Sequence, residues 1–262
     1  MYRTNSLKER LKAGGVAYGM ISAMGSAVAA EMIGIAGYDY VIVDGEHGLG
    51  DMEGHLHTLQ AISSTPATAL CRVEHNDRTV LKHALDLGVE GVMVPCVSTA
   101  AEAQAVVAAC RYPPEGVRGF AAGMVRASDY GSSVQRYLSD GAGQLLVAVM
   151  VETAEGVRNA GEIAAVQGVD VVQIGPADLS FDLGVAGRLD DPRFLAAQTA
   201  FEEAVKARGK TLGGAVMPGI SLDYLLERGY RMITMGADVV CLSRALSAAL
   251  AAVRKGSAVP RT

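Results

Sequence analysis

The chain has 262 residues, of which 50% are hydrophobic and 19% are charged. This balance excludes a disordered segment and is enough to bury a sizeable core, either in one large α/β barrel or in two ordinary domains. The formal net charge is −5 and the Lys and Arg residues form no block, which argues against binding to nucleic acid or to an anionic membrane surface.

The beginning of the chain and its cysteines bear on its location. The first residues lack the apolar stretch of a secretion signal, and no apolar run reaches the roughly 20 residues that span a bilayer. The four cysteines are spread along the chain without a Cys-x-x-Cys pair, so neither a disulfide framework nor a thiolate zinc site is expected. We therefore expect a cytoplasmic protein.

Short β-branched runs alternate with longer amphipathic segments along the whole chain. After an opening helix at 6–13, the predicted strands are 16–21, 40–43, 68–72, 91–94, 145–151, 169–174, 212–216 and 232–235. The main predicted helices after them are 27–35, 79–87, 100–109, 154–165, 194–207, 221–228 and 243–253. Eight strand–helix repeats in about 250 residues predict an α/β fold, a single (β/α)8 TIM barrel over residues 1–262.

An open, doubly wound sheet is the alternative architecture. The first turn after a strand, at 22–26, lacks the Gly-x-Gly-x-x-Gly phosphate fingerprint of that fold, and no change of composition marks a domain boundary. The barrel is therefore favoured. The longest departure from the repeat is 111–143, and we expect this segment to lie over the barrel mouth.

Barrel enzymes carry their chemistry at the C-terminal ends of the strands, so the polar residues that follow each apolar run are the candidates. They are Asp44, Glu46 and His47 after the second strand, Arg72 at the end of the third, Glu152 after the fifth, and Asp178 after the sixth. Glu152 and Asp178 can share one hard cation such as Mg²⁺ or Mn²⁺ and leave its other positions to water and substrate. The alternative for each carboxylate is a helix cap, although Glu is a poor one.

The histidines and Arg72 can be weighed in the same way. His47 follows two acids in a glycine-flanked turn, which favours a general base over a structural histidine. Arg72 ends an apolar strand and needs an anionic partner, which is either a ligand oxygen or Glu46 or Glu152. The other histidines follow no strand end and are expected on the surface; they are His55, His57, His75 and His83.

Five segments together resemble the metal-dependent (class II) pyruvate aldolases of the aldolase/citrate lyase family. They are residues 37–48, 72–77, 112–119, 151–153 and 174–180. The likeness implies a TIM barrel whose C-terminal helix is exchanged between the subunits of a homo-oligomer, typically a hexamer built as a trimer of dimers. It also implies reversible cleavage of a 4-hydroxy-2-oxo acid, such as a 2-keto-3-deoxy sugar acid or a related diacid, to pyruvate and an aldehyde through a metal-stabilised enolate.

The resemblance also implies roles for matching residues. Glu152 and Asp178 would hold the divalent metal, which is Mg²⁺, Mn²⁺ or Co²⁺. His47 would act as the base through a water molecule, Asp86 would raise the basicity of that histidine, and Arg72 would stabilise the enolate.

The substrate contacts implied by the resemblance are less complete. The motif at 174–180 would bind pyruvate through Gly175, Ala177 and Asp178, with Asp44 and Glu46 in support. Two departures from the family pattern concern these contacts. Many relatives carry a glutamine that bonds the substrate where this chain has Met150, and many have proline and an aromatic residue where it has residues 73–75.

Other reactions remain open at this point. An acyl-CoA thioester lyase and an oxaloacetate decarboxylase share metal-enolate chemistry, and a non-catalytic barrel that senses an oxo acid is a third hypothesis. A Schiff-base aldolase requires a lysine on a strand, whereas the six lysines fall on predicted helices or before strands.

Overall fold

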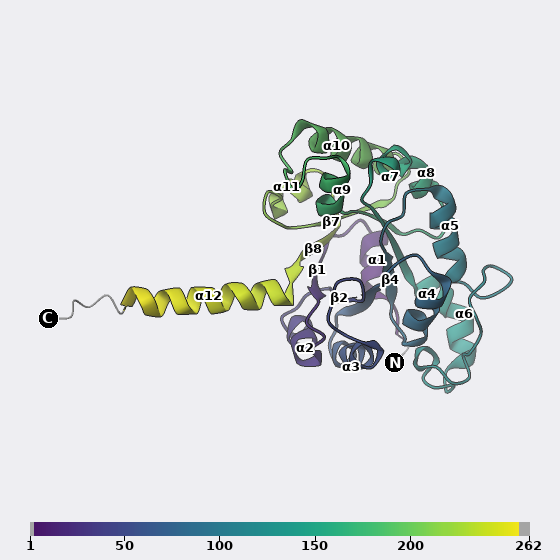
Figure 1. Cartoon of the computed structure of the whole chain (residues 1–262). Helices are drawn as coiled ribbons and strands as arrows, with labels where there is room; N and C mark the ends of the chain where they lie inside the picture. Colours follow the sequence, from purple (N-terminus) through teal and green to yellow (C-terminus); the bar gives the residue numbers. More distant parts are fainter. Residues whose placement is uncertain (1–2, 257–262) are drawn as a thin grey trace.

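The computed structural model describes residues 3–256 and contains eight parallel strands closed into a barrel (Figure 1). The strands pair in chain order, and β8 pairs again with β1. They are β1 (Ala17–Ser22), β2 (Tyr40–Asp44), β3 (Thr68–Arg72), β4 (Gly91–Val94), β5 (Leu146–Val151), β6 (Val171–Ile174), β7 (Thr211–Ala215) and β8 (Met232–Ala237). The predicted (β/α)8 barrel is confirmed, and the open sheet is excluded.

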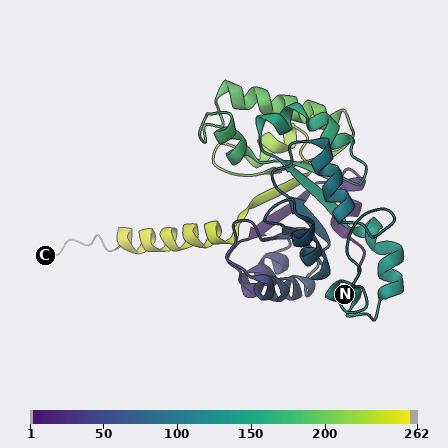
Figure 2. The ribbon, with the colours of Figure 1, turned by 45° about the vertical axis from the view of Figure 1, so that its right-hand side comes forward.

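Helices surround the barrel and return the chain from the C-terminal end of one strand to the N-terminal end of the next (Figures 1 and 2). Side-chain caps start several of them; in α5 the Thr99 hydroxyl and the Glu102 carboxylate each accept from the other residue's backbone N–H. The helices are α1 (Ser6–Lys12), α2 (Ala27–Ile35), α3 (Met52–Ser63), α4 (Arg78–Asp86), α5 (Ala100–Ala109), α6 (Val134–Gln144), α7 (Ala154–Arg158), α8 (Ala160–Ala165), α9 (Pro176–Asp182), α10 (Pro192–Lys206), α11 (Leu222–Glu227) and α12 (Asp238–Gly256), with a 3-10 turn η1 (Arg126–Ser128).

Several helical segments differ from the sequence prediction, and one of them, α6, lies almost wholly within 111–143, where no helix was predicted. The helix predicted at 154–165 is interrupted at Asn159, where φ is −94° and ψ is 2°, so that α7 and α8 are separate. The seven residues of α9 were not predicted, because so short a helix shows little periodicity. The last helix begins directly after β8 at Asp238, earlier than the predicted 243.

Two separate apolar cores follow from the alternation of side chains along the strands. One lies inside the barrel and includes Tyr40, Ile42, Met93 and Met150, and the larger one lies between the strands and the helices. Leu7 and Leu11 of α1 belong to the interior cluster, so this helix closes the N-terminal end of the barrel.

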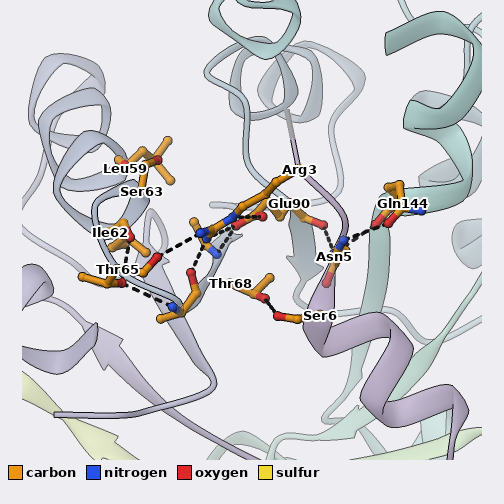
Figure 3. Close-up of polar contacts among 12 residues, drawn as sticks. Arg3, Asn5, Ser6, Leu59, Ile62, Ser63, Thr65, Thr68, Glu90 and Gln144 are labelled. Carbon is orange, nitrogen blue, oxygen red and sulfur yellow. Dashed lines mark hydrogen bonds and ion pairs between the residues drawn. The ribbon is translucent and has the colours of Figure 1, made fainter. Parts of the chain in front are cut away.

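Polar contacts of the N-terminal segment seal the same end (Figure 3). The Arg3 guanidinium lies 2.7 Å from the Glu90 carboxylate and donates to the carbonyls of Thr65, at 2.9 Å, and Ala67. Asn5 donates through its side-chain amide to the carbonyls of Glu90 and Gln144, at 2.7 and 2.9 Å. These contacts join three loops that are distant in sequence.

The segment 111–143 also lies at the N-terminal end, and the expectation that it covers the mouth was wrong. Its Arg118 pairs with Asp86 at the end of α4, at 2.7 Å, and its Arg126 donates to the Leu87 carbonyl, at 2.8 Å. The reason is the order of elements. The segment follows α5, which has already returned the chain to the N-terminal ends of the strands.

The last helix, α12, extends away from the barrel in both views (Figures 1 and 2). It carries a series of exposed apolar side chains, which are Val239, Val240, Leu242, Leu246, Leu250 and Val253. Within residues 3–256, every helix is too short or too polar to cross a membrane.

Candidate active site

The ends of β2 and β3 place an arginine between two carboxylates. Asp44 and Arg72 are direct partners in the register of the two strands. The Arg72 guanidinium donates to both oxygens of Asp44, at 2.9 and 2.8 Å, and its third nitrogen lies 3.1 Å from the Glu46 carboxylate. All the charged groups of this cluster come from two adjacent strand ends, so the sequence order alone brings them together.

Burial and charge act in opposite directions on these acids. Burial by itself raises the pKa of Asp44, but the hydrogen bonds and charge of Arg72 and two backbone N–H groups bring that pKa below its usual value. Burial dominates at Glu46 and raises its pKa, although Arg72 and His47 oppose this. Asp44 therefore stays negatively charged beside Arg72, and Glu46 is the more easily protonated of the two carboxylates.

His47 stands at the solvent side of this cluster. Its side chain is 70% exposed, and its Nε2 lies 3.7 Å from a Glu46 carboxylate oxygen. The structure does not place Asp86 near it. Asp86 ends α4 and bonds to Arg118 at the opposite end of the barrel, so within one chain the pairing that the resemblance implied is not formed.

Glu152 follows β5 and is 4% exposed. The backbone N–H of Cys96 donates to one of its oxygens, and a Cβ at Gly175 would overlap the other, so the carboxylate lies against the glycine backbone. Burial and the charges of Glu152, Glu46 and Asp178 raise the pKa of the Cys96 thiol to about 12. That thiol therefore lies within the field of three carboxylates that come from different strand ends.

A cavity of about 170 Å³ opens at the C-terminal end of the barrel. Asp178 and Ala177, in the first turn of α9, lie on its border with Gly175, and Arg72 lines the same space. The strands contribute further lining residues, which are Ile21, Ile42, Met93, Met150, Gln173, Ala215 and Thr234. A cavity of this size, with a cationic side chain and a helix start at its edge, suits a small organic acid.

The remaining histidines and the lysines lie away from this cavity. His57, His75 and His83 are exposed as predicted, but His55 is half buried and its Nε2 has no partner, so its predicted surface position was wrong. Burial lowers the pKa of His55. The lysines lie on α1, α4, α10 and α12, or before β7 in the case of Lys210. None of them follows a strand end, as the sequence predicted.

A family model described as HpcH/HpaI aldolase/citrate lyase matches residues 18–245. The chain belongs to this family. A hydroxypyruvate/pyruvate aldolase from Agrobacterium fabrum is 35% identical, over 97% of this chain and 95% of that protein. A 4-hydroxy-2-oxo-heptane-1,7-dioate aldolase from Escherichia coli is 37% identical over 93% of each chain. The crystal structure of a family protein from Burkholderia cenocepacia is 38% identical, with a TM-score of 0.91 over 96% of this chain and all of that one.

The donor set of this HpcH/HpaI family member fits a hard divalent cation. Glu152 is a buried carboxylate that is held by a backbone N–H and lies against Gly175, a lining residue of the cavity. Asp178 is an exposed carboxylate that lines this cavity. Within the described residues, no three His, Cys, Asp or Glu side chains are grouped to hold a metal by themselves. Two carboxylates leave the other positions to water and substrate oxygens, as is usual for Mg²⁺.

Two residues of this site were missed by sequence reasoning. Cys96 holds Glu152 through its backbone, and nothing in its side chain signals that contact. Gln173 lines the cavity from within β6. The sequence did carry a signal for Gln173, because it is a polar residue in an otherwise apolar run, and a strand of a parallel sheet is buried on both faces.

Proposed function

We propose that this chain is a divalent-metal-dependent aldolase that reversibly cleaves a 4-hydroxy-2-oxo acid to pyruvate and an aldehyde. The observation that carries the proposal is Arg72, fixed by Asp44 and Glu46 at the rim of a small cavity bordered by Asp178. A fixed guanidinium in that position is suited to the negative charge that carbon–carbon cleavage leaves on pyruvate. The names of the relatives from Agrobacterium fabrum and Escherichia coli support the same class of reaction.

The residues divide the reaction between them. The C4 hydroxyl loses its proton, the C3–C4 bond breaks with its electron pair left on pyruvate, and the aldehyde departs. His47 accepts the proton, and Glu46, 3.7 Å from its Nε2, stabilises the resulting imidazolium. Arg72 stabilises the negative charge on pyruvate until C3 is protonated.

Glu152 and Asp178 are the proposed metal-holding residues, with Mg²⁺ or Mn²⁺, or alternatively Co²⁺, as the ion. A divalent cation supplies positive charge that lowers the energy of the developing anion. Gly175, which has no side chain, leaves space for Glu152. Ala177 presents its backbone to the substrate carboxylate.

We propose further that the protein is a cytoplasmic homo-oligomer, a hexamer built as a trimer of dimers, in which α12 is exchanged between subunits. The support is the exposed apolar side of α12 together with exposed Val28, Met32 and Ile35 on α2, a surface of matching character. Asp86 can act on His47 only between two subunits, since the two lie at opposite ends of one barrel. Light scattering that gives a monomer at micromolar concentration would contradict the assembly.

The decisive experiment is a coupled assay of pyruvate release across a panel of 4-hydroxy-2-oxo acids, with Mg²⁺ or Mn²⁺ and with EDTA. We expect release of pyruvate and aldehyde together, and none in EDTA. Full activity in EDTA, or an enzyme–pyruvate adduct trapped by borohydride, would overturn the proposal. Oxaloacetate and a CoA thioester belong in the panel, because turnover of these alone would indicate the decarboxylase or the thioester lyase.

A further inference from the structure

Gln173 is a polar side chain inside the barrel. It lies on β6, is 4% exposed and lines the cavity that Arg72 and Asp178 border. Its Oε1 is buried and has no hydrogen-bond partner. The other polar side chain at this depth, Thr234, is paired with the hydroxyl of Tyr40 at 3.1 Å, so Gln173 is the exception among these lining residues.

The neighbouring strands make room for this amide without bonding to it. On β7, a Cβ at Gly213 would overlap the Gln173 oxygen, so the glycine is what allows the amide to lie there. On β5, the direct partner of Gln173 in the register is Met150, whose thioether donates no hydrogen bond. An apolar side chain of the same length would fill this space without burying an unpaired polar atom.

An unpaired amide kept in a substrate-sized cavity indicates a ligand. We propose that Gln173 is a substrate-contacting residue, whose amide hydrogen-bonds an oxygen of the oxo acid from the floor of the cavity while Arg72 acts at the rim. The carboxylate and ketone oxygens of such an acid accept hydrogen bonds, and the amide can rotate to present its N–H₂. The inference rests on the proposed function for the identity of the acid.

The test compares Gln173→Met with the matched control Gln198→Met, the same substitution at a buried glutamine outside this cavity, whose amide is bonded to Tyr224 and Tyr230. Pyruvate binding is measured by calorimetry in the presence of Mn²⁺, and thermal unfolding is measured without pyruvate. For Gln173→Met we expect pyruvate affinity and kcat/KM to fall about tenfold, as for the loss of one hydrogen bond. Its unliganded thermal stability should match or exceed that of the wild type. Gln198→Met should lose stability, because its amide has partners, and should still bind pyruvate within about twofold of the wild type in the folded fraction.

Gln173→Met with wild-type affinity for pyruvate would overturn the inference, as would a large loss of thermal stability with binding unchanged in the folded fraction. Failure of the proposed function gives a different result. In that case the wild type releases no pyruvate from any acid of the panel, while the calorimetric comparison still reports whether Gln173 contacts an oxo acid.

Discussion

At the C-terminal end of the barrel, Arg72 is fixed beside an open cavity and His47 faces solvent. At the N-terminal end, Arg3 is surrounded by carbonyl oxygens and the Glu90 carboxylate (Figure 3). Lys8 lies among similar groups, the Leu145 carbonyl and the Asp170 carboxylate. Both ends therefore hold charged groups beside a cavity, because Arg3, Arg118 and Arg126 line a space of about 290 Å³ at the N-terminal end. Those arginines are bonded to groups of the segments that they join, whereas the C-terminal end adds an exposed histidine at the ends of the strands. The difference indicates chemistry at one end and stabilisation of the closed barrel at the other.

The N-terminal end depends on contacts between segments far apart in the chain. Lys8 donates to the Leu145 carbonyl at 2.6 Å and to Asp170 at 2.8 Å, while Asp170 also accepts from the backbone of Val147 at 2.9 Å. One lysine thus ties α1 to the starts of β5 and β6. Substitutions at the two ends should therefore separate activity from stability.

Glu152→Gln should have the largest effect. Removing the charge of this carboxylate weakens the binding of a divalent cation, so we expect kcat to fall by at least about 10³-fold. Metal content measured after dialysis and pyruvate release in excess Mn²⁺ check this. Circular dichroism should be unchanged, and an active variant with no bound metal would refute the assignment.

His47→Ala should come next. If His47 moves the C4 hydroxyl proton, cleavage should slow by roughly 10²–10⁴-fold and its pH profile should shift. Exchange of the methyl protons of pyruvate, followed by NMR, is the control, because that step does not involve the C4 hydroxyl. Near-normal cleavage with an unchanged acid limb would remove His47 from the mechanism.

Arg72→Lys keeps the charge but loses the planar fork that spans Asp44 and Glu46. We expect a loss on the order of 10²-fold in kcat, with a smaller change in pyruvate affinity. Single-turnover kinetics separate the two quantities. A loss of this size in pyruvate affinity, with no loss in kcat, would assign Arg72 to binding alone.

Lys8→Met tests the N-terminal end. It leaves the Asp170 carboxylate with only its backbone donor, so we expect the free energy of unfolding to fall by about 2 kcal/mol. Chemical denaturation measures this, and kcat/KM at 25 °C should stay within about twofold of the wild type. Lys12→Met, on the same helix, is the matched control. A selective loss of activity would mean that the two ends are coupled.

His55 gives the smallest predicted effect, a pH dependence of stability. Burial lowers the pKa of His55 in the folded protein, although the charges of Asp51, Asp44 and Glu74 oppose this. Cys71 and His83 line the cavity beside it. The unfolded chain therefore binds the proton more readily, and stability is lost as pH falls through about 6.5. His55→Gln should flatten this slope and His57→Gln, which is exposed, should not. Identical slopes in all three proteins would contradict the prediction.

The sequence was informative where position along a strand determines position in space. Asp44, Arg72 and Glu152 were predictable because parallel strands end at one edge of a barrel. The location of 111–143 was also available from element order, but the segment was assigned to the wrong end. The half-buried state of His55 and the unpaired oxygen of Gln173 depend on packing between distant segments, which periodicity does not report.

The contact between Glu152 and Gly175 has a consequence for how this protein can change over generations. Any side chain at 175 displaces the Glu152 carboxylate, so a replacement at one of the two positions alone gives an impaired enzyme. The two positions can therefore vary only together. Directed evolution toward other aldehydes should therefore hold this pair constant. Diversity belongs in Met93, Met150 and Ala215, which line the same cavity and hold no charge.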